Sequence, residues 1–339
     1  MDYVKEMEND IMDWKELINL LKGHKTYLQM HNFPDPDAMA SAYGMQQFLK
    51  YHGIETTICY EGTIDKLSTK RMITEFNMEV FPYSEVEADM KEADYIVTID
   101  GQKYNSNFTD LPGDEVACID HHPTYIECEY KYKDVRITGA CSSIIAEYFY
   151  ESNTPIDENT ASALVYGLRM DTASLTRGVS TLDIEMFSYL YKYADNDKIM
   201  NFYINVMEMS DLKAYGAAIE NVCVIDGVGF AHIPFGCNDA LIAMISDFIL
   251  SLNEVNTCIV YADRDGGYKL SVRSMNSGIH AGKLTKDALE GIGNGGGHAE
   301  MAGGIIYPDS VKNIRDNIED IVKERFLNIV KNGCEKVRD

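Results

Sequence analysis

The chain has 339 residues, of which 45% are hydrophobic and 25% are charged, and its formal net charge is −24. A chain of this length is expected to form two domains, since domains usually have roughly 100–200 residues. The acidic balance argues against binding of duplex nucleic acid, which needs a basic surface. It leaves small anionic substrates open, because bound divalent ions can reverse the local field.

The sequence predicts neither a membrane span nor a secretory signal. It contains no run of roughly 18 apolar residues, and its acidic beginning, MDYVKEMENDIMDWKEL, lacks the basic and apolar regions of a signal peptide. The eight cysteines are scattered, with no C-x-x-C pair, and this usage favours a reducing compartment. We therefore expect a cytoplasmic protein without membrane partners.

Predicted strands and helices alternate through the first half of the chain. In chain order these elements are a helix over 8–22, a strand over 25–31, a helix over 38–52, strands over 55–62, 94–100 and 115–120, and helices over 139–152 and 159–171. Such alternation predicts a doubly wound α/β domain with a mostly parallel sheet. In these sheets ligands bind outside the carboxyl ends of the strands. Three predicted strands end there at His31, Asp100 and Asp120, which suggests a site.

After about residue 190 the pattern changes to hairpins and helices, which predict a smaller α+β domain. Its predicted elements are a helix over 210–222, hairpins over 222–235 and 258–274, and helices over 245–253 and 311–330. The hairpins are expected to turn at Asp226-Gly227 and at Asp265-Gly266-Gly267, where glycine follows aspartate. The predicted domain limits are 1–195 for the first domain, 196–219 for a linker and 220–339 for the second domain.

The segment HNFPDPDA carries three candidate metal ligands, His31, Asp35 and Asp37. Pro36 disfavours helical backbone at Asp35, so we expect a loop from which a histidine and carboxylates surround a cation. Asp37 is also placed to cap the helix that begins near residue 38. Taken alone, an ordinary Pro-Asp turn with a helix cap explains this pattern equally well.

Asp100 and the triplet Asp120-His121-His122 each close an apolar strand. The two oxygens of Asp100 could bridge two metal ions, although a single aspartate at a strand end is more often part of a turn. Adjacent histidines on an extended backbone point to opposite sides. Only one of the pair is therefore expected to share an ion with Asp100, and the other would face substrate or solvent.

Asp171 follows the apolar segment LVYGLRM, a position that suits a metal ligand and equally a helix end. The candidate ligands are imidazoles and carboxylates without a thiolate, and this set favours Mn²⁺ over Fe²⁺, Co²⁺, Zn²⁺ or Mg²⁺. Their number exceeds what one ion needs. We therefore expect two divalent ions ~3.5–4 Å apart, the arrangement of two-metal phosphoester hydrolysis.

The glycine-rich segment GIGNGGGHAEMAGG, residues 291–304, is interpreted as a loop that binds phosphate. Consecutive glycines let backbone N–H groups approach phosphate oxygens, and His298 adds a donor. The segment lacks the Gly-Lys-Ser/Thr of a P-loop, and a flexible linker is the usual alternative. Arg273-Ser274, at the end of a predicted strand, could clamp phosphate from the same domain, or the arginine could lie on the surface.

In this order, the segments resemble the DHH phosphoesterase family, in the branch that carries a DHH-associated C-terminal domain. The resemblance covers most of the chain and rests on HNFPDPDA, Asp100 in VTIDG, Asp120-His121-His122, Asp171, Arg273-Ser274 and GGGHAEMAGG. Motif spacing is similar to that of the nanoRNase and pAp-phosphatase group. Departures from the commoner pattern are Pro36 where glycine is frequent, Gly101-Gln102 after Asp100, and Arg169-Met170 before Asp171.

The resemblance implies a two-metal, usually Mn²⁺-dependent, phosphodiesterase or phosphatase with its active site in a cleft between the domains. It implies that one ion is held by His31, Asp35 and Asp100, and the other by Asp37, Asp100, His121 and Asp171. It places Asp120 behind the ligands and turns His122 toward the substrate. The residues implied to hold the nucleotide are Arg273, Ser274, Gly295, Gly296, Gly297 and His298.

The resulting hypothesis is hydrolysis of a phosphoester on pAp, a dinucleotide such as pApA, or a short single-stranded RNA, by metal-activated water. Arg273 would stabilise phosphoryl charge and His122 would protonate the leaving oxygen, with Asp120 as a third catalytic residue. Two other enzyme functions stay open, a cyclic-dinucleotide phosphodiesterase and a single-strand DNA exonuclease. A nucleotide-binding or sensing protein without turnover, and a homodimer, are also left open.

Overall fold

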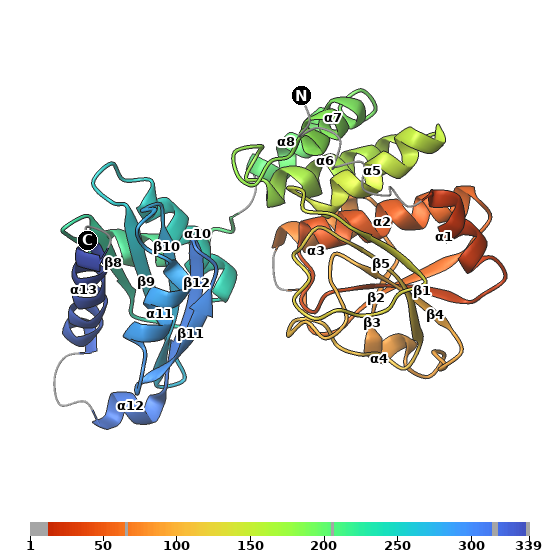
Figure 1. Cartoon of the computed structure of the whole chain (residues 1–339). Coiled ribbons are helices and arrows are strands. Elements are labelled where there is room, and N and C mark those ends of the chain that lie inside the picture. The colour runs from red at the N-terminus through yellow and green to blue at the C-terminus, as the bar shows by residue number, and fades with distance from the viewer. Residues whose placement is uncertain (1–12, 65–66, 205–206, 314–317, 337–339) are drawn as a thin grey trace. The chain divides into compact units, whose positions relative to one another are not determined.

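The computed structural model describes residues 13–64, 67–204, 207–313 and 318–336. The chain divides into two compact units, Met1–Val206 and Met207–Asp339 (Figure 1). This division falls inside the segment 196–219 that we assigned to a linker, and helices occupy parts of that segment on both sides of it. The domain limits themselves stay a prediction, and each unit is described by itself.

The first unit is built on a six-stranded sheet of order β3-β2-β1-β4-β5-β6 in which every pair of neighbouring strands is parallel. Its strands are β1 (Thr26–Met30), β2 (Thr56–Tyr60), β3 (Val80–Pro82), β4 (Tyr95–Ile99), β5 (Asp114–Asp120) and β6 (Tyr132–Val135). The sheet confirms the doubly wound α/β prediction. The chain leaves β1 toward β2 on one side and later returns to β4 on the other, so the strand order reverses between β1 and β4.

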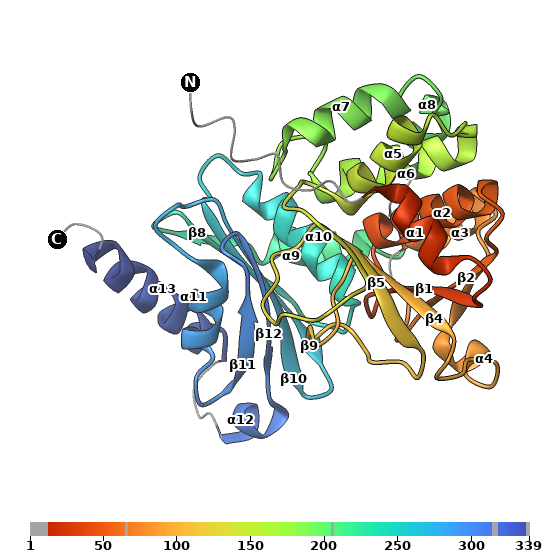
Figure 2. The ribbon, with the colours of Figure 1, turned by 45° about the vertical axis from the view of Figure 1, so that its right-hand side comes forward.

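The helices of the first unit are α1 (Trp14–Leu21), α2 (Pro36–Tyr51), α3 (Leu67–Glu75), α4 (Tyr83–Val86), α5 (Cys141–Ser152), α6 (Glu158–Asp171), α7 (Thr181–Leu190) and α8 (Asn196–Ile204). The helix expected over 8–22 corresponds to α1, and its part before residue 13 lies outside the described residues. Helices α2 and α5 pack on the sheet, and α6 packs on both of them. Figure 2 shows α5, α6, α7 and α8 gathered on one side of this sheet.

Side chains alternate between the two faces of the sheet, as parallel strands covered on both sides require. On β1, Leu28 and Met30 are fully buried in the main core, which they share with residues of α2 and α5. Tyr27, which precedes Leu28, packs on the opposite face in a smaller cluster with Val86 and Met90. Burial of all five residues of β1 fixes the position of the loop that follows it.

The second unit holds a six-stranded sheet of order β11-β12-β10-β9-β8-β7, antiparallel except for β8 and β9. Its strands are β7 (Cys223–Ile225), β8 (Val228–Ile233), β9 (Thr257–Arg264), β10 (Gly267–Ser274), β11 (Gly293–Gly297) and β12 (Met301–Ile306). Both expected hairpins are present. Their turns place Asp226, Gly227, Asp265 and Gly266 at positive φ, which aspartate tolerates and glycine favours.

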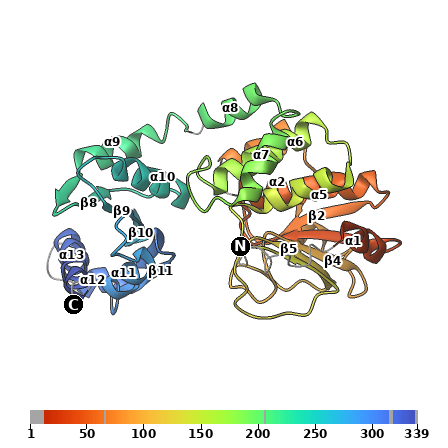
Figure 3. The same ribbon diagram turned by 45° about the horizontal axis from the view of Figure 1, so that its top comes forward.

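The helices of the second unit are α9 (Leu212–Glu220), α10 (Asp239–Leu250), α11 (Ala281–Ala288), α12 (Pro308–Asn313) and α13 (Ile318–Lys336). Helices α9 and α10 cover one face of the sheet and α11 and α13 the other (Figure 3). The helix expected over 311–330 corresponds to parts of α12 and α13, with residues 314–317 outside the described part. No helix in the described part of the chain is long and apolar enough to cross a membrane.

The loop predicted over 291–304 is wrong as secondary structure, because most of this segment forms the antiparallel pair β11 and β12. Glycine has no side chain to pack in a strand. The segment therefore shows no alternation of apolar and polar side chains from which a strand could be predicted. The glycines of this segment allow α11 to pack closely on it. A Cβ on Gly295 would lie 2.6 Å from Thr285 Cγ2 of α11, and a Cβ on Gly282 of α11 would lie 2.1 Å from the carbonyl oxygen of Gly297. Helix α11 therefore packs directly on the glycine backbone.

Candidate metal centre

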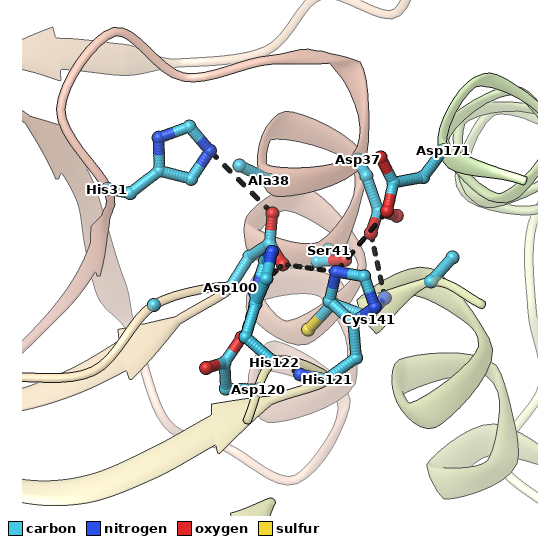
Figure 4. Close-up of polar contacts among 12 residues, drawn as sticks. His31, Asp37, Ala38, Ser41, Asp100, Asp120, His121, His122, Cys141 and Asp171 are labelled. Atoms are coloured by element: carbon cyan, nitrogen blue, oxygen red, sulfur yellow. Dashed lines mark hydrogen bonds and ion pairs between the residues drawn. The ribbon is translucent and has the colours of Figure 1, made fainter. Parts of the chain in front are cut away.

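The candidate ligands of the first unit meet at the carboxyl ends of β1, β4 and β5, which are neighbours in the sheet. His31 and Asp100 follow β1 and β4, and Asp120 is the last residue of β5. The strand order reverses between β1 and β4, where open parallel sheets form their ligand-binding crevice. Figure 4 shows His31, Asp37, Asp100, His121 and Asp171 turned toward one another at this edge.

The start of α2 explains the two aspartates and the proline of the first motif. The side chain of Asp35, not of Asp37 as we expected, caps the helix by accepting hydrogen bonds from the N–H groups of Asp37 (2.9 Å) and Ala38 (3.1 Å). Pro36 occupies the first helical position, where proline is favoured because no intrahelical N–H bond is lost. Asp35 keeps the extended backbone that a following proline requires, with φ −94° and ψ −178°.

Asp37 is released from capping and lies almost fully buried, with 1% of its surface exposed. Its carboxylate accepts hydrogen bonds from the first N–H groups of α5, those of Cys141 (2.7 Å) and Ser142 (3.0 Å), and from the Ser142 hydroxyl. The N-terminus of a helix favours a negative charge. Burial nevertheless raises the pKa of Asp37 well above its ordinary value, and the nearby charges of Asp100 and Asp171 raise it further.

Asp100 lies at the centre of the cluster, 2% exposed, on a left-handed backbone with φ 56°. Its Oδ1 is 3.3 Å from His121 Nε2, and its Oδ2 is 3.7 Å from His31 Nε2. Both rings are oriented from behind, since His31 Nδ1 is 2.8 Å from the carbonyl oxygen of Asn32 and His121 Nδ1 is 3.1 Å from that of Thr138. A carbonyl oxygen only accepts, so Nδ1 carries the hydrogen and Nε2 faces the carboxylates. Metal-binding histidines are held in this way.

Two atoms at this centre lack the partners that burial demands. Asp100 Oδ1 and His121 Nε2 are buried, and neither has a hydrogen-bond partner among the described residues. Buried polar atoms are normally satisfied. Burial alone would lower the pKa of His121, but contact with Asp100 and the charges of Asp37 and Asp171 raise it to about 11. The centre therefore holds excess negative charge that a proton or a cation would neutralise.

Asp171 ends α6 and brings a further carboxylate to the centre, with Oδ2 3.3 Å from His121 Nε2. Burial raises its pKa to about 6, and the charges of Asp35 and Asp100 add to this effect. Helix α6 reaches the centre because Gly167 has no side chain. A Cβ there would lie 2.5 Å from Ser142 Oγ and 3.1 Å from Asp37 Oδ1.

The ligand atoms fall into groups whose members all lie within 4.8 Å of one another. The groups are His31, Asp35 and Asp100; Asp37, His121 and Asp171; and Asp100, His121 and His122. The first two match the sets that the family resemblance implies, except that Asp100 is not in the second. Its 3.3 Å contact with His121 nevertheless ties it to that group. Mixed imidazole and carboxylate ligands with unsatisfied buried atoms fit a pair of hard divalent cations.

Asp120 and His122 form a pair beside this cluster. The Asp120 carboxylate is fully buried, and its Oδ1 is 2.8 Å from His122 Nδ1. Gln102 donates to Asp120 Oδ2 (2.7 Å) and to the carbonyl oxygen of His122 (3.1 Å), which fixes both groups. Burial alone would lower the pKa of His122, but the hydrogen bond with Asp120 raises it.

The two histidine rings do not point to opposite sides, as an extended backbone would require. Their centroids are 4.1 Å apart, and His122 Nδ1 lies 3.8 Å from Asp100 Oδ1. The strand β5 ends at Asp120 and the backbone bends at His122, so the alternation of a strand no longer applies. His122 is the more exposed ring, with 45% of its side chain accessible against 8% for His121.

The remaining candidate residues lie in the second unit. Arg273 on β10 is paired with Asp247 of α10, with 2.7 Å between Nε and Oδ1, and its Nη1 donates to Ser271 Oγ. Ser274 is buried, and its hydroxyl lies 3.0 Å from that of Thr257. Gly295, Gly296 and Gly297 belong to β11, and His298 follows them with an exposed side chain. Of these glycines, a Cβ on Gly296 would meet nothing within 4 Å.

Sequence reasoning missed a buried aspartate, Asp183, that holds residues 139–143 next to the candidate metal centre. Asp183 in α7 is fully buried and accepts hydrogen bonds from Gly139 N (2.8 Å), Ser143 Oγ (2.5 Å) and Ser180. It thereby fixes the turn that presents the Thr138 carbonyl to His121 and starts α5. The spacing Ser180-x-x-Asp183 is a capping-box signal, but it does not reveal the contact with residues 139–143.

Comparison with known proteins identifies two family domains. Residues 25–168 match the model of the DHH family N-terminal domain, and residues 224–324 match the DHHA1 domain. The uncharacterized protein MJ1633 of Methanocaldococcus jannaschii is 27% identical over 309 residues, which cover 88% of this chain and 63% of that protein. This chain therefore spans less than two thirds of that relative.

A second relative has a full-length match. The probable bifunctional oligoribonuclease and PAP phosphatase NrnA of Streptococcus mutans is 24% identical, with 94% of this chain and 99% of that protein covered. Among solved structures, the exopolyphosphatase-related protein from Bacteroides fragilis superposes with a TM-score of 0.76 at 18% identity, over 96% of this chain and 99% of that one. This likeness shows a shared fold. The two domain matches show that the chain belongs to the DHH phosphoesterase family and carries a DHHA1 domain.

Proposed function

We propose that the protein is a phosphoesterase that hydrolyses short nucleotides with two divalent ions, preferably Mn²⁺, at the carboxyl edge of the first sheet. The observation that supports it most directly is the pair of unsatisfied buried atoms, Asp100 Oδ1 and His121 Nε2, among converging carboxylates. A protein that only binds nucleotide gains nothing from so many buried carboxylates, which repel one another and the phosphate. Bound cations offset this repulsion, so the same carboxylates suit a metal centre.

The chain's own residues have separate roles in this proposal. His31, Asp35, Asp37, Asp100, His121 and Asp171 hold the ions, which when bound lower the pKa of water and stabilise phosphoryl charge. His122 holds a hydrogen on Nδ1 against Asp120, and its Nε2 is left to donate a proton to the leaving oxygen. Asp120 favours the protonated ring, and the exposed edge of His122 gives substrate access to it.

The proposed substrates are pAp, pApA and short single-stranded RNA. They agree with the name of the NrnA relative, and the net charge of −24 suits small substrates better than long polymers. We propose that Arg273, Ser274, Gly295, Gly296, Gly297 and His298 bind the nucleotide. Arg273 would then exchange its surface ion pair with Asp247 for a phosphate, a small loss because the Asp247 side chain is 62% exposed.

The test is hydrolysis by the full chain with Mn²⁺ of a panel containing pAp, pApA, cyclic di-AMP, short RNA and short DNA. We expect release of mononucleotide or phosphate from pAp and pApA, and loss of turnover in Asp100→Asn. A matched control is Asp94→Asn, at the opposite end of β4, where the Asp94 side chain accepts a bond from Lys91 N and pairs with Lys25. Preferred turnover of cyclic di-AMP or DNA would favour the alternative enzymes.

A nucleotide sensor would give a different result. It would bind pApA without product, and Asp100→Asn would bind as well as the unchanged protein. That combination would contradict the enzyme proposal, because removal of the central carboxylate from a metal centre must weaken binding of a metal-dependent ligand.

A further inference from the structure

Phe33 is an exposed aromatic side chain inside the first metal-binding motif. It has 61% of its surface accessible, and its backbone φ is 56°. A bulky residue in the left-handed region is strained, and such strain persists only where the surroundings impose it. Neither the exposure nor the strain is explained by the core or by the metal ligands.

The loop that carries Phe33 is held from both sides. The N–H of Phe33 donates to the carbonyl oxygen of Glu61 (3.1 Å), and the N–H of Asn32 donates to that of Asn107 (2.7 Å). The Asn32 side chain also exchanges hydrogen bonds with Thr109. The backbone of Phe33 is therefore fixed to the loops that follow β2 and β4.

The ring itself is seated on a glycine. A Cβ on Gly62 would lie 2.8–3.1 Å from three carbons of the Phe33 ring, so the ring rests against the bare backbone of Gly62. The result is a preorganised aromatic surface that is open to solvent. In the sequence, Phe33 lies between His31 and Asp35, which belong to one ligand group.

We propose that Phe33 is a stacking platform for the nucleobase of the substrate whose phosphate lies at the metal centre. This inference rests on the proposed function and narrows its substrate class to nucleotides with an unpaired base, as opposed to inorganic phosphates or sugar phosphates. Stacking of a base on an aromatic side chain strengthens binding by roughly 5- to 150-fold and tolerates any base, because every base has a π-face. A fixed ring loses little entropy when the base binds.

The test compares pAp with ribose 3′,5′-bisphosphate, which has the same phosphates and no base. For Phe33→Leu, which keeps an apolar side chain of similar size, we expect the ratio of kcat/KM for pAp to kcat/KM for the base-free compound to fall roughly 5- to 150-fold. Phe33→Trp should keep the ratio. The matched control is Tyr51→Leu, because Tyr51 is equally exposed (61%) but ends α2, roughly 24 Å along the helix from Asp35.

An unchanged ratio in Phe33→Leu would overturn the inference. If the ratio is unchanged because kcat/KM falls equally on both substrates, the loop only shapes the metal ligands. Failure of the proposed function is distinguishable, since the unchanged protein would then hydrolyse neither compound. In that case stacking is tested by binding, with the fluorescence of 2-aminopurine ribonucleoside 3′,5′-bisphosphate measured as the protein is added in the presence of Mg²⁺. Fluorescence quenching that Phe33→Leu removes would still support stacking, and absence of quenching would contradict it.

Discussion

Asp171→Asn should stabilise the metal-free protein and weaken its response to Mn²⁺. Without a cation, the Asp171 carboxylate is buried beside Asp35 and Asp100, and its pKa rises from 3.8 to about 6. The folded state thus holds this proton more tightly than the unfolded chain. Stability therefore falls as pH rises from about 4 to about 6, and the full cost of the ionised carboxylate is present above that range.

The size of the effect follows from the pKa difference. A rise from 3.8 to about 6 corresponds to roughly 3 kcal/mol. Asparagine has the same shape without the charge, so at pH 8 we expect up to this gain in the free energy of unfolding. For a unit of this size, that is an increase in Tm of roughly 6–12 °C at most.

Mn²⁺ should reduce the difference in stability between the two proteins, because it stabilises the unchanged protein more than Asp171→Asn. At a concentration 100 times its Kd, the ion stabilises the unchanged protein by about 2.7 kcal/mol. A 10- to 100-fold loss of affinity in Asp171→Asn would reduce this to roughly 0.4–1.4 kcal/mol at the same concentration. The single tryptophan, Trp14, lies in α1 of the first unit, so its fluorescence reports unfolding of that unit alone.

The control is Asp157→Asn, at the other end of α6. Asp157 caps this helix by accepting from Thr160 N (3.0 Å), and asparagine caps equally well, so both Tm and the Mn²⁺ response should stay as in the unchanged protein. A metal-free Asp171→Asn protein that is less stable than the unchanged one at pH 8 would refute the electrostatic reasoning. An undiminished Mn²⁺ response would remove Asp171 from the ligand set.

Three further substitutions test the residues behind the ligands. Gln102→Leu frees the Asp120 carboxylate, and we expect kcat to fall roughly 10- to 100-fold with little change in KM; an equal rise in KM would show a binding role instead. Asp183→Ala leaves several buried donors unpaired and should cost roughly 3–5 kcal/mol in denaturant unfolding; a cost below ~1 kcal/mol would contradict the hydrogen-bond assignment. Gly167→Ala places a methyl group against Ser142 Oγ, and calorimetry should show weaker Mn²⁺ binding with roughly 1–3 kcal/mol of destabilisation; normal affinity would show that α6 can shift freely.

The sequence was most informative where an apolar strand pattern ends in a side chain that can bind a metal ion. Apolar strands that end in His31, Asp100 and Asp120 predicted both the parallel sheet and the edge at which the ligands meet, because strand ends of a parallel sheet share one edge. The hairpin turns were equally predictable, since Asp-Gly pairs favour positive φ.

What the sequence could not reveal depends on contacts between distant segments. Asp35 and Asp37 are both plausible caps by type, and only the position of Pro36 in the first turn assigns the cap to Asp35 and leaves Asp37 for α5. The glycines of β11 show no strand pattern, because their role is set by α11 packing against their backbone. Asp183 joins residues about 40 positions apart, which no local pattern encodes.

The most direct test of the central claim is electron paramagnetic resonance of the full chain titrated with Mn²⁺. Two ions ~3.5–4 Å apart would share a carboxylate and couple their spins. We therefore expect two tightly bound Mn²⁺ per chain with an exchange-coupled spectrum, and loss of the coupling in Asp100→Asn, because Asp100 contacts both histidines. Binding of a single isolated Mn²⁺, or an unchanged coupled spectrum in Asp100→Asn, would contradict the two-metal centre.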